Sequence, residues 1–177
     1  DFQFYEFLKN YHEKDSKHNH KADLGNEEDV IAILDGQQRM TSMYIALTGS
    51  YSSKTPYYRW DSPHAFPKKK LYLNLLAKSD DIEVDYDFKF LTDNEAENSP
   101  TKFWFEVGKV LDFIDISKVM EFLMLNGLMD TSKYTQEQAT FALQTLNQFF
   151  NIIHQKGTIS YYLEESEELD KVLQIFI

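Results

Sequence analysis

The chain contains no cysteine, so it forms no disulfide, holds no metal through thiolates and has no cysteine nucleophile. None of its apolar runs approaches the roughly 20 residues that a helix needs to cross a bilayer. The first residues also lack the pattern of a signal peptide. These absences predict a cytoplasmic protein that does not contact a membrane.

Basic residues are few, because 18 lysines and arginines stand against 29 aspartates and glutamates, for a formal net charge of −11. This balance argues against a stand-alone nucleic-acid coat, which is usually basic. The 177 residues are 42% hydrophobic and 15% aromatic. They suffice for the core of one domain, or of a small α/β unit with a helical subdomain.

The most informative local feature is a polar string that follows an apolar run. Residues 30–34 are apolar and partly β-branched, which predicts a strand covered on both faces. The string comes directly after it and reads Asp35-Gly36-Gln37-Gln38-Arg39. Gly36 can adopt the positive φ that an abrupt turn needs. We therefore expect the strand to end at Asp35 in a sharp turn.

A helix is expected after this turn. Apolar side chains recur with helical spacing at Met40, Met43, Tyr44 and Leu47. Gly49 stands where helices often end. The pattern predicts a helix that begins near Met40, so its unpaired first amides would face whatever lies above Asp35.

These residue types suit a phosphate or nucleotide site. The positive end of a helix favours anions, and the Arg39 guanidinium can hold two phosphate oxygens. Gln37 and Gln38 can each donate and accept, so they can orient a water or read a sugar or base edge. A carboxylate beside a phosphate needs a cation or a proton between them, which makes Asp35 a candidate Mg²⁺ ligand or general base. The alternative is structural: Asp35 caps the helix, Arg39 pairs with it, and the glutamines are solvated.

The stretch Ile33-Leu34-Asp35-Gly36-Gln37-Gln38-Arg39-Met40-Thr41-Ser42 resembles the signature of a large bacterial family with a DGQQR motif. That family, long catalogued as a domain of unknown function, includes the GmrSD-type modification-dependent restriction proteins. Segments 70–75, 159–163 and 168–177 resemble its later strands and helix, so the likeness covers nearly the whole chain.

The resemblance implies an α+β fold of two parts. Residues 1–113 would form a ParB/sulfiredoxin-like mixed α/β unit that carries the strand-turn-helix, and residues 114–177 a mainly helical part packed on it. The family's usual opening hairpin and its usual continuation beyond a terminal Phe-Ile are absent here. We therefore expect the chain to be a fragment of a longer protein.

The resemblance also implies a role in phage restriction, with nucleotide binding and hydrolysis, or nuclease function, at the DGQQR turn. Carried over by position, the catalytic residues are Asp35, Gln37, Gln38 and Arg39. The nucleotide-binding residues are Gly36, Arg39 and Thr41, and the metal ligand is Asp35. The expected substrate is a nucleoside triphosphate with Mg²⁺ or another divalent cation. The expected partners are DNA, through the full-length protein, and an HNH-type nuclease domain or subunit.

Three functions remain open at this point. The first, which we favour, is binding and hydrolysis of a nucleoside triphosphate in support of DNA restriction. The second is a direct metal-dependent DNA nuclease that uses the same residues. The third is a non-catalytic domain in which the turn senses DNA phosphate or a modified base.

Elsewhere, periodicity predicts a short helix over residues 4–11 and strands over 57–60, 71–75 and 86–91. A further apolar piece at 103–105 is a candidate strand that leads into 107–113. Residues from Ser117 onward are expected to be mainly helical, with a long helix at 136–154. An acidic run after Leu163 predicts another helix start, capped by Ser166.

Two smaller groups of residues allow more than one interpretation. Lys68, Lys69 and Lys70, with Arg59 and Trp60 upstream, could touch a nucleic-acid backbone or could form a solvated loop edge that guards a strand. The histidines at 12, 18 and 20 lie near carboxylates, but a solvated loop is favoured over a metal site there. His64, in an H-x-x-P sequence, is interpreted as a chance match to an HNH nuclease.

Overall fold

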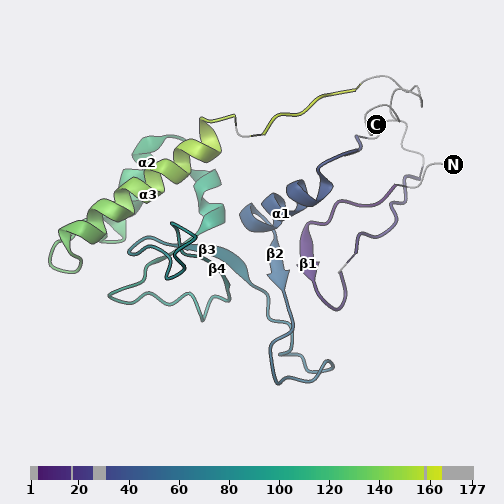
Figure 1. Cartoon of the computed structure of the whole chain (residues 1–177), viewed down its shortest axis with the longest axis horizontal. Coiled ribbons are helices and arrows are strands. Elements are labelled where there is room, and N and C mark those ends of the chain that lie inside the picture. Colours follow the sequence, from purple (N-terminus) through teal and green to yellow (C-terminus); the bar gives the residue numbers. More distant parts are fainter. Residues whose placement is uncertain (1–3, 17, 26–30, 158, 165–177) are drawn as a thin grey trace.

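The computed structural model of the protein describes residues 4–16, 18–25, 31–157 and 159–164. Within these residues the chain forms a two-stranded parallel sheet, a three-stranded antiparallel sheet and several helices (Figure 1). The predicted α+β class is therefore confirmed.

The larger sheet has β3 (Lys70–Asn74) at its centre, flanked by β4 (Phe88–Leu91) and β5 (Trp104–Glu106), both antiparallel to it. These strands confirm the predictions for 71–75, 86–91 and 103–105, apart from shifts at their ends. The segment after β5 is a 3-10 helix, η1 (Val107–Asp112).

Two helices cover this sheet: α2 (Ile116–Leu125) and α3 (Gln136–His154). Asp115 begins α2 by accepting a 2.8 Å hydrogen bond from the Ser117 amide. Thr135 and Gln138 form a capping box at the start of α3, where each side chain accepts a backbone N–H of the other residue. The helical character predicted after Ser117 is confirmed.

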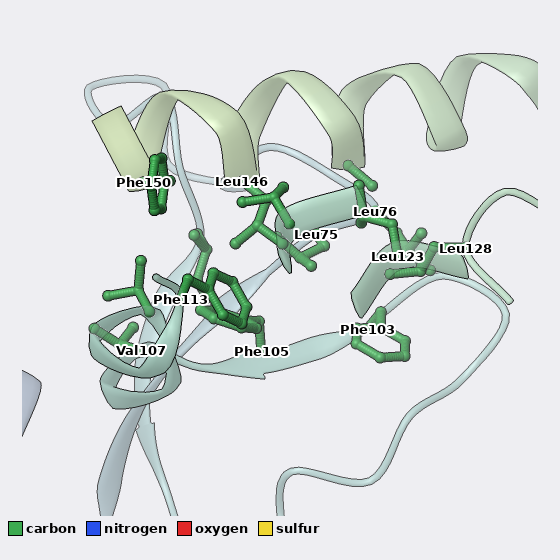
Figure 2. Packing of buried hydrophobic residues seen from close by; sticks show 14 residues of the cluster. Leu75, Leu76, Phe103, Phe105, Val107, Phe113, Leu123, Leu128, Leu146 and Phe150 are labelled. Carbon is green, nitrogen blue, oxygen red and sulfur yellow. The ribbon is translucent and has the colours of Figure 1, made fainter. Parts of the chain in front are cut away.

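The hydrophobic core lies between the larger sheet and these two helices (Figure 2). Leu75 and Phe105 come from the sheet side, and Leu123 and Leu146 come from α2 and α3. All four side chains are almost completely buried. The sheet and the helical part thus share one core, and the proposed division at residue 113 stays a prediction.

The smaller sheet pairs β1 (Asn10–His12) in parallel with β2 (Ser50–Ser52), and α1 (Gln37–Leu47) lies between them in the chain. Two glycines allow close approaches at the end of α1. A Cβ at position 49 would collide with the Lys9 carbonyl oxygen, and one at Gly108 with that of Leu47. The C-terminal end of α1 is thereby held against both β1 and η1.

The predicted helix over residues 4–11 is wrong. Tyr5 forms an isolated bridge with Lys21, and Tyr11 lies in β1 opposite Tyr51, with the two rings stacked 5.0 Å apart. Phe7 packs instead on Tyr44 of α1. The apolar spacing is helical, but pairing with a strand some 40 residues away satisfies this backbone better.

Three predicted strands are also wrong within the described residues. Residues 57–60 are a loop, because Lys54 donates to the carbonyls of Thr55 and Tyr58 and curls the backbone. Residues 31–34 and 159–163 form neither a strand nor a helix and pair with no strand in the described part of the chain, and Ile31 is 95% exposed. Val30 and the helix expected after Ser166 lie outside the described residues.

One stability prediction comes from Tyr72 of β3, whose hydroxyl donates to Asp93 at 3.1 Å. Burial, with this hydrogen bond, raises the pKa of Tyr72 from 10.0 to about 12. The folded protein therefore keeps a proton that the unfolded chain releases between these two values. The stabilisation that the protonated Tyr72 gives to the folded protein is complete below pH 10 and is lost as the pH rises to about 12.

Urea titrations between pH 10 and about 12 should show this loss. The free energy of unfolding of the unchanged protein should fall by roughly 2–3 kcal/mol more than that of Tyr72→Phe, which has no phenol to titrate. The pKa of Lys70 is also raised, by its hydrogen bond to Glu106. Both proteins contain Lys70, so the stability that they lose when it deprotonates is the same and cancels in the comparison. Parallel curves for the two proteins would contradict the prediction.

Candidate functional site

The DGQQR turn joins residues 31–34, which form no regular secondary structure, to α1. Gly36 has φ +74° and is the N-cap of α1, which confirms the positive φ predicted there. The helix begins at Gln37 and not near Met40, so the prediction of its start was three residues late. Gln37, Gln38 and Arg39 therefore form the first turn of the helix.

Asp35 and Arg39 form an ion pair across this turn. One carboxylate oxygen of Asp35 accepts a 2.6 Å hydrogen bond from the Gly36 amide, and the other lies 3.6 Å from Arg39 Nη2. A Cβ at Gly36 would lie 3.3 Å from Arg39 Nη2, so glycine leaves room for the guanidinium over the turn. The two charged side chains are 78% and 79% exposed, and such pairs contribute at most about 1 kcal/mol. A bound anion can therefore displace the carboxylate at little cost.

The two glutamines differ in their surroundings. Gln37 Nε2 donates to the Ile33 carbonyl at 2.7 Å, which ties the helix start to the segment before the turn. The Gln38 side chain is exposed and makes no hydrogen bond to the described residues. Gln38 is thus the amide that is available to a ligand or a water.

The first turn of α1 also presents free backbone amides. Met40 donates to the Gly36 carbonyl at 2.9 Å as the first bond of the helix, and no side chain caps the turn. The amides of Gln37, Gln38 and Arg39 have no acceptor in the described residues. They leave partial positive charge at the helix start, which favours an anion.

These groups border one open hollow of about 330 Å³, lined by Leu34, Asp35, Gly36, Gln37, Gln38 and Arg39. The structure thus brings together the five motif residues that the sequence singled out. Thr41, the remaining expected nucleotide-binding residue, is half-buried further along α1 and does not line the hollow. The Gln37 tie to Ile33 was not foreseen, although their spacing of four residues suits a side chain that reaches back over a turn.

Among the residues that the structure describes, Asp35 is the only carboxylate that lines the hollow. In the described part of the chain, no three histidine, aspartate or glutamate side chains lie close enough together to hold a metal, and this includes His12, His18 and His20. Mg²⁺ commonly binds through one or two carboxylates together with phosphate oxygens and waters. The donor set at this turn therefore fits Mg²⁺ only together with a bound phosphate.

None of the helices within the described residues combines the length and the apolar character required to span a membrane.

Comparison with known proteins identifies one family. The sequence model described as the GmrSD restriction endonuclease, N-terminal domain, matches residues 5–177. The match spans the DGQQR turn, both sheets and α1 to α3. A search of curated proteins found no match.

Proposed function

The chain belongs to the family of GmrSD restriction endonuclease N-terminal domains, and from its role in a restriction system we propose that it binds a nucleoside triphosphate at the DGQQR turn. Hydrolysis of the nucleotide, with Mg²⁺, would then support DNA restriction. DNA and an HNH-type nuclease domain or subunit are the partners that this function calls for.

The observation that carries this proposal is the convergence of anion-binding groups on one hollow. Three helix-start amides, for which the described residues supply no acceptor, and the Arg39 guanidinium border the same space. Backbone N–H groups at a helix start, joined by a planar cation, are a recurrent phosphate-binding arrangement. Asp35, the one acidic side chain among the described residues that line the hollow, accepts a hydrogen bond from the Gly36 amide.

Each side chain has a role in this proposal. Arg39 would hold two phosphate oxygens in place of its ion pair with Asp35, and the Asp35 carboxylate would be the protein ligand for Mg²⁺. The metal supplies neutralisation of charge on the phosphates. Gln38, whose side chain makes no hydrogen bond to the described residues, would orient a water or contact the nucleotide, while Gln37 keeps the turn closed through the Ile33 carbonyl.

The two arginines of the chain allow a matched test of nucleotide binding. Arg39 and Arg59 are both largely exposed, and each pairs with a nearby aspartate, at 3.6 Å and 3.5 Å. We expect Arg39→Ala to weaken binding of ATP or GTP with Mg²⁺ by at least about tenfold, since hydrogen bonds to charged groups contribute about 1.5–3 kcal/mol. Arg59→Ala should bind as the unchanged protein does. Isothermal titration calorimetry measures the affinities, and circular dichroism checks the fold.

Equal affinities in both variants, or no nucleotide binding by the unchanged protein, would overturn the proposal. A direct metal-dependent nuclease at this turn has less support, because the described residues offer one carboxylate in the hollow as a ligand. Hydrolysis is tested separately, by phosphate release from any variant that still binds nucleotide.

A further inference from the structure

A second feature of the surface is the loop of residues 53–68, here called the aromatic loop. It connects β2 to β3 and extends away from the rest of the chain (Figure 1). Tyr51 and Lys69 close its base through reciprocal backbone hydrogen bonds of 2.9 Å. Three of the four prolines of the chain lie within it, at positions 56, 63 and 67.

Contacts hold this loop in one conformation. The Thr55 amide donates to the Ala65 carbonyl at 2.7 Å, and Glu13 accepts from the Lys54 amide at 2.6 Å. The Phe66 ring packs between Trp60 and His12, with centroids 5.1 Å and 5.0 Å away. Binding to a loop that is already held by such contacts costs little conformational entropy.

The tip of the aromatic loop nevertheless exposes large aromatic side chains. Tyr57 is fully exposed, and Tyr58 and Trp60 are about half exposed. Tyr57 also has φ +69°, a conformation that is costly for a residue other than glycine. The loop thus holds aromatic faces toward solvent at a cost in backbone strain.

The charge of this region is opposite to that of the whole protein. Residues 54–70 carry five basic side chains and one acidic side chain, in a chain of net charge −11. Lys68 is exposed and makes no hydrogen bond or ion pair within the described residues. Beside the aromatic tip, an open hollow of about 370 Å³ is lined by Tyr57, Tyr58, Arg59, Asp61 and Ser62. Basic groups next to exposed aromatic rings suit a nucleic-acid strand.

We propose that the aromatic loop binds a single-stranded segment of DNA. An unpaired base stacks on Tyr57 and Tyr58, its edge meets the polar side chains of the hollow, and Lys68 contacts the phosphates. The base must be unpaired because both faces of a base are covered in a stacked duplex. Membership of a restriction family makes DNA the nucleic acid, and this binding does not require a nucleotide at the DGQQR turn.

Fluorescence anisotropy tests the proposal with labelled DNA of about 16 nucleotides, single-stranded or as the duplex, without nucleotide or Mg²⁺. Tyr57→Gly should weaken binding to the single strand by about 5- to 150-fold, the usual effect of removing one stacking ring. Glycine tolerates positive φ, so the melting temperature should not fall. Tyr57→Phe keeps the ring and should bind as the unchanged protein does.

A second pair of variants tests the phosphate contact. Lys68→Ala should reduce the slope of log affinity against log salt by about 0.7, whereas Lys133→Ala, at the distant turn before α3, should leave it unchanged. Trp60 fluorescence should also be quenched by the single strand, because the other tryptophan, Trp104, is buried. The proposal is overturned if the unchanged protein does not bind the single strand, or if Tyr57→Gly binds it with unchanged affinity.

Discussion

Replacing Phe105 with alanine should lower the free energy of unfolding by about 3–5 kcal/mol, the range usual for a buried phenylalanine. Phe105 is 1% exposed at the centre of the core (Figure 2). Its ring lies 5.1 Å from that of Phe122 in an edge-to-face arrangement and 6.0 Å from that of Phe113. Truncation removes both ring contacts and leaves a cavity between the sheet and α2.

Phe88 supplies the matched control for this change. It lies in β4, on the other side of β3 in the same sheet, but is 39% exposed, and its ring lies 6.3 Å from that of Phe149. Urea unfolding followed by circular dichroism should show a clearly smaller loss for Phe88→Ala than for Phe105→Ala. Similar losses for the two variants would mean that the core is not centred where the structure places it.

Replacing Asn74 with leucine should lower the free energy of unfolding about as much as Phe105→Ala does, although the two side chains at position 74 have nearly the same volume. The Asn74 side chain is 1% exposed, and its oxygen accepts from the amides of Leu76 at 3.1 Å and Phe103 at 3.2 Å. Leucine leaves both amides buried without an acceptor, and each such group costs about 1–3 kcal/mol. The expected loss is therefore roughly 2–6 kcal/mol.

A surface asparagine provides the comparison. Asn98 is exposed and accepts one hydrogen bond, from the Trp104 amide at 2.8 Å, so Asn98→Leu should cost only about 1 kcal/mol. Hydrogen exchange adds a local measurement, because the Leu76 and Phe103 amides should lose protection in Asn74→Leu. A leucine variant as stable as the unchanged protein would show that other acceptors replace Asn74.

The local patterns that predicted correctly are those in which one face of an element is buried. The helical spacing from Ser117 onward corresponds to α2 and α3, whose buried residues face the sheet. The apolar pieces at 71–75 and 103–105 correspond to β3 and β5. In these elements, periodicity and burial agree, so the nearest neighbours in sequence are enough to identify the element.

The same reasoning failed where distant partners decide the conformation. Tyr11 has helical spacing with Phe7 and Leu8, yet it pairs with Tyr51 in β1. The segment 57–60 is rich in residues that favour strands, yet Pro56 precedes it and Lys54 Nζ donates to the Tyr58 carbonyl within it. Neither outcome follows from the residue types of the segment alone, because the competing hydrogen bonds come from residues outside it.

The candidate site shows the same division. The sequence by itself determined that a carboxylate, a glycine, two amides and a guanidinium follow one another, and it identified the family. It also predicted the positive φ of Gly36, because that property belongs to the residue itself. Only the tertiary structure decided that α1 begins at Gln37, that Arg39 pairs with Asp35, and that Gln37 binds the Ile33 carbonyl. These choices depend on which donor and acceptor meet once the chain has folded, and composition and spacing do not contain that information.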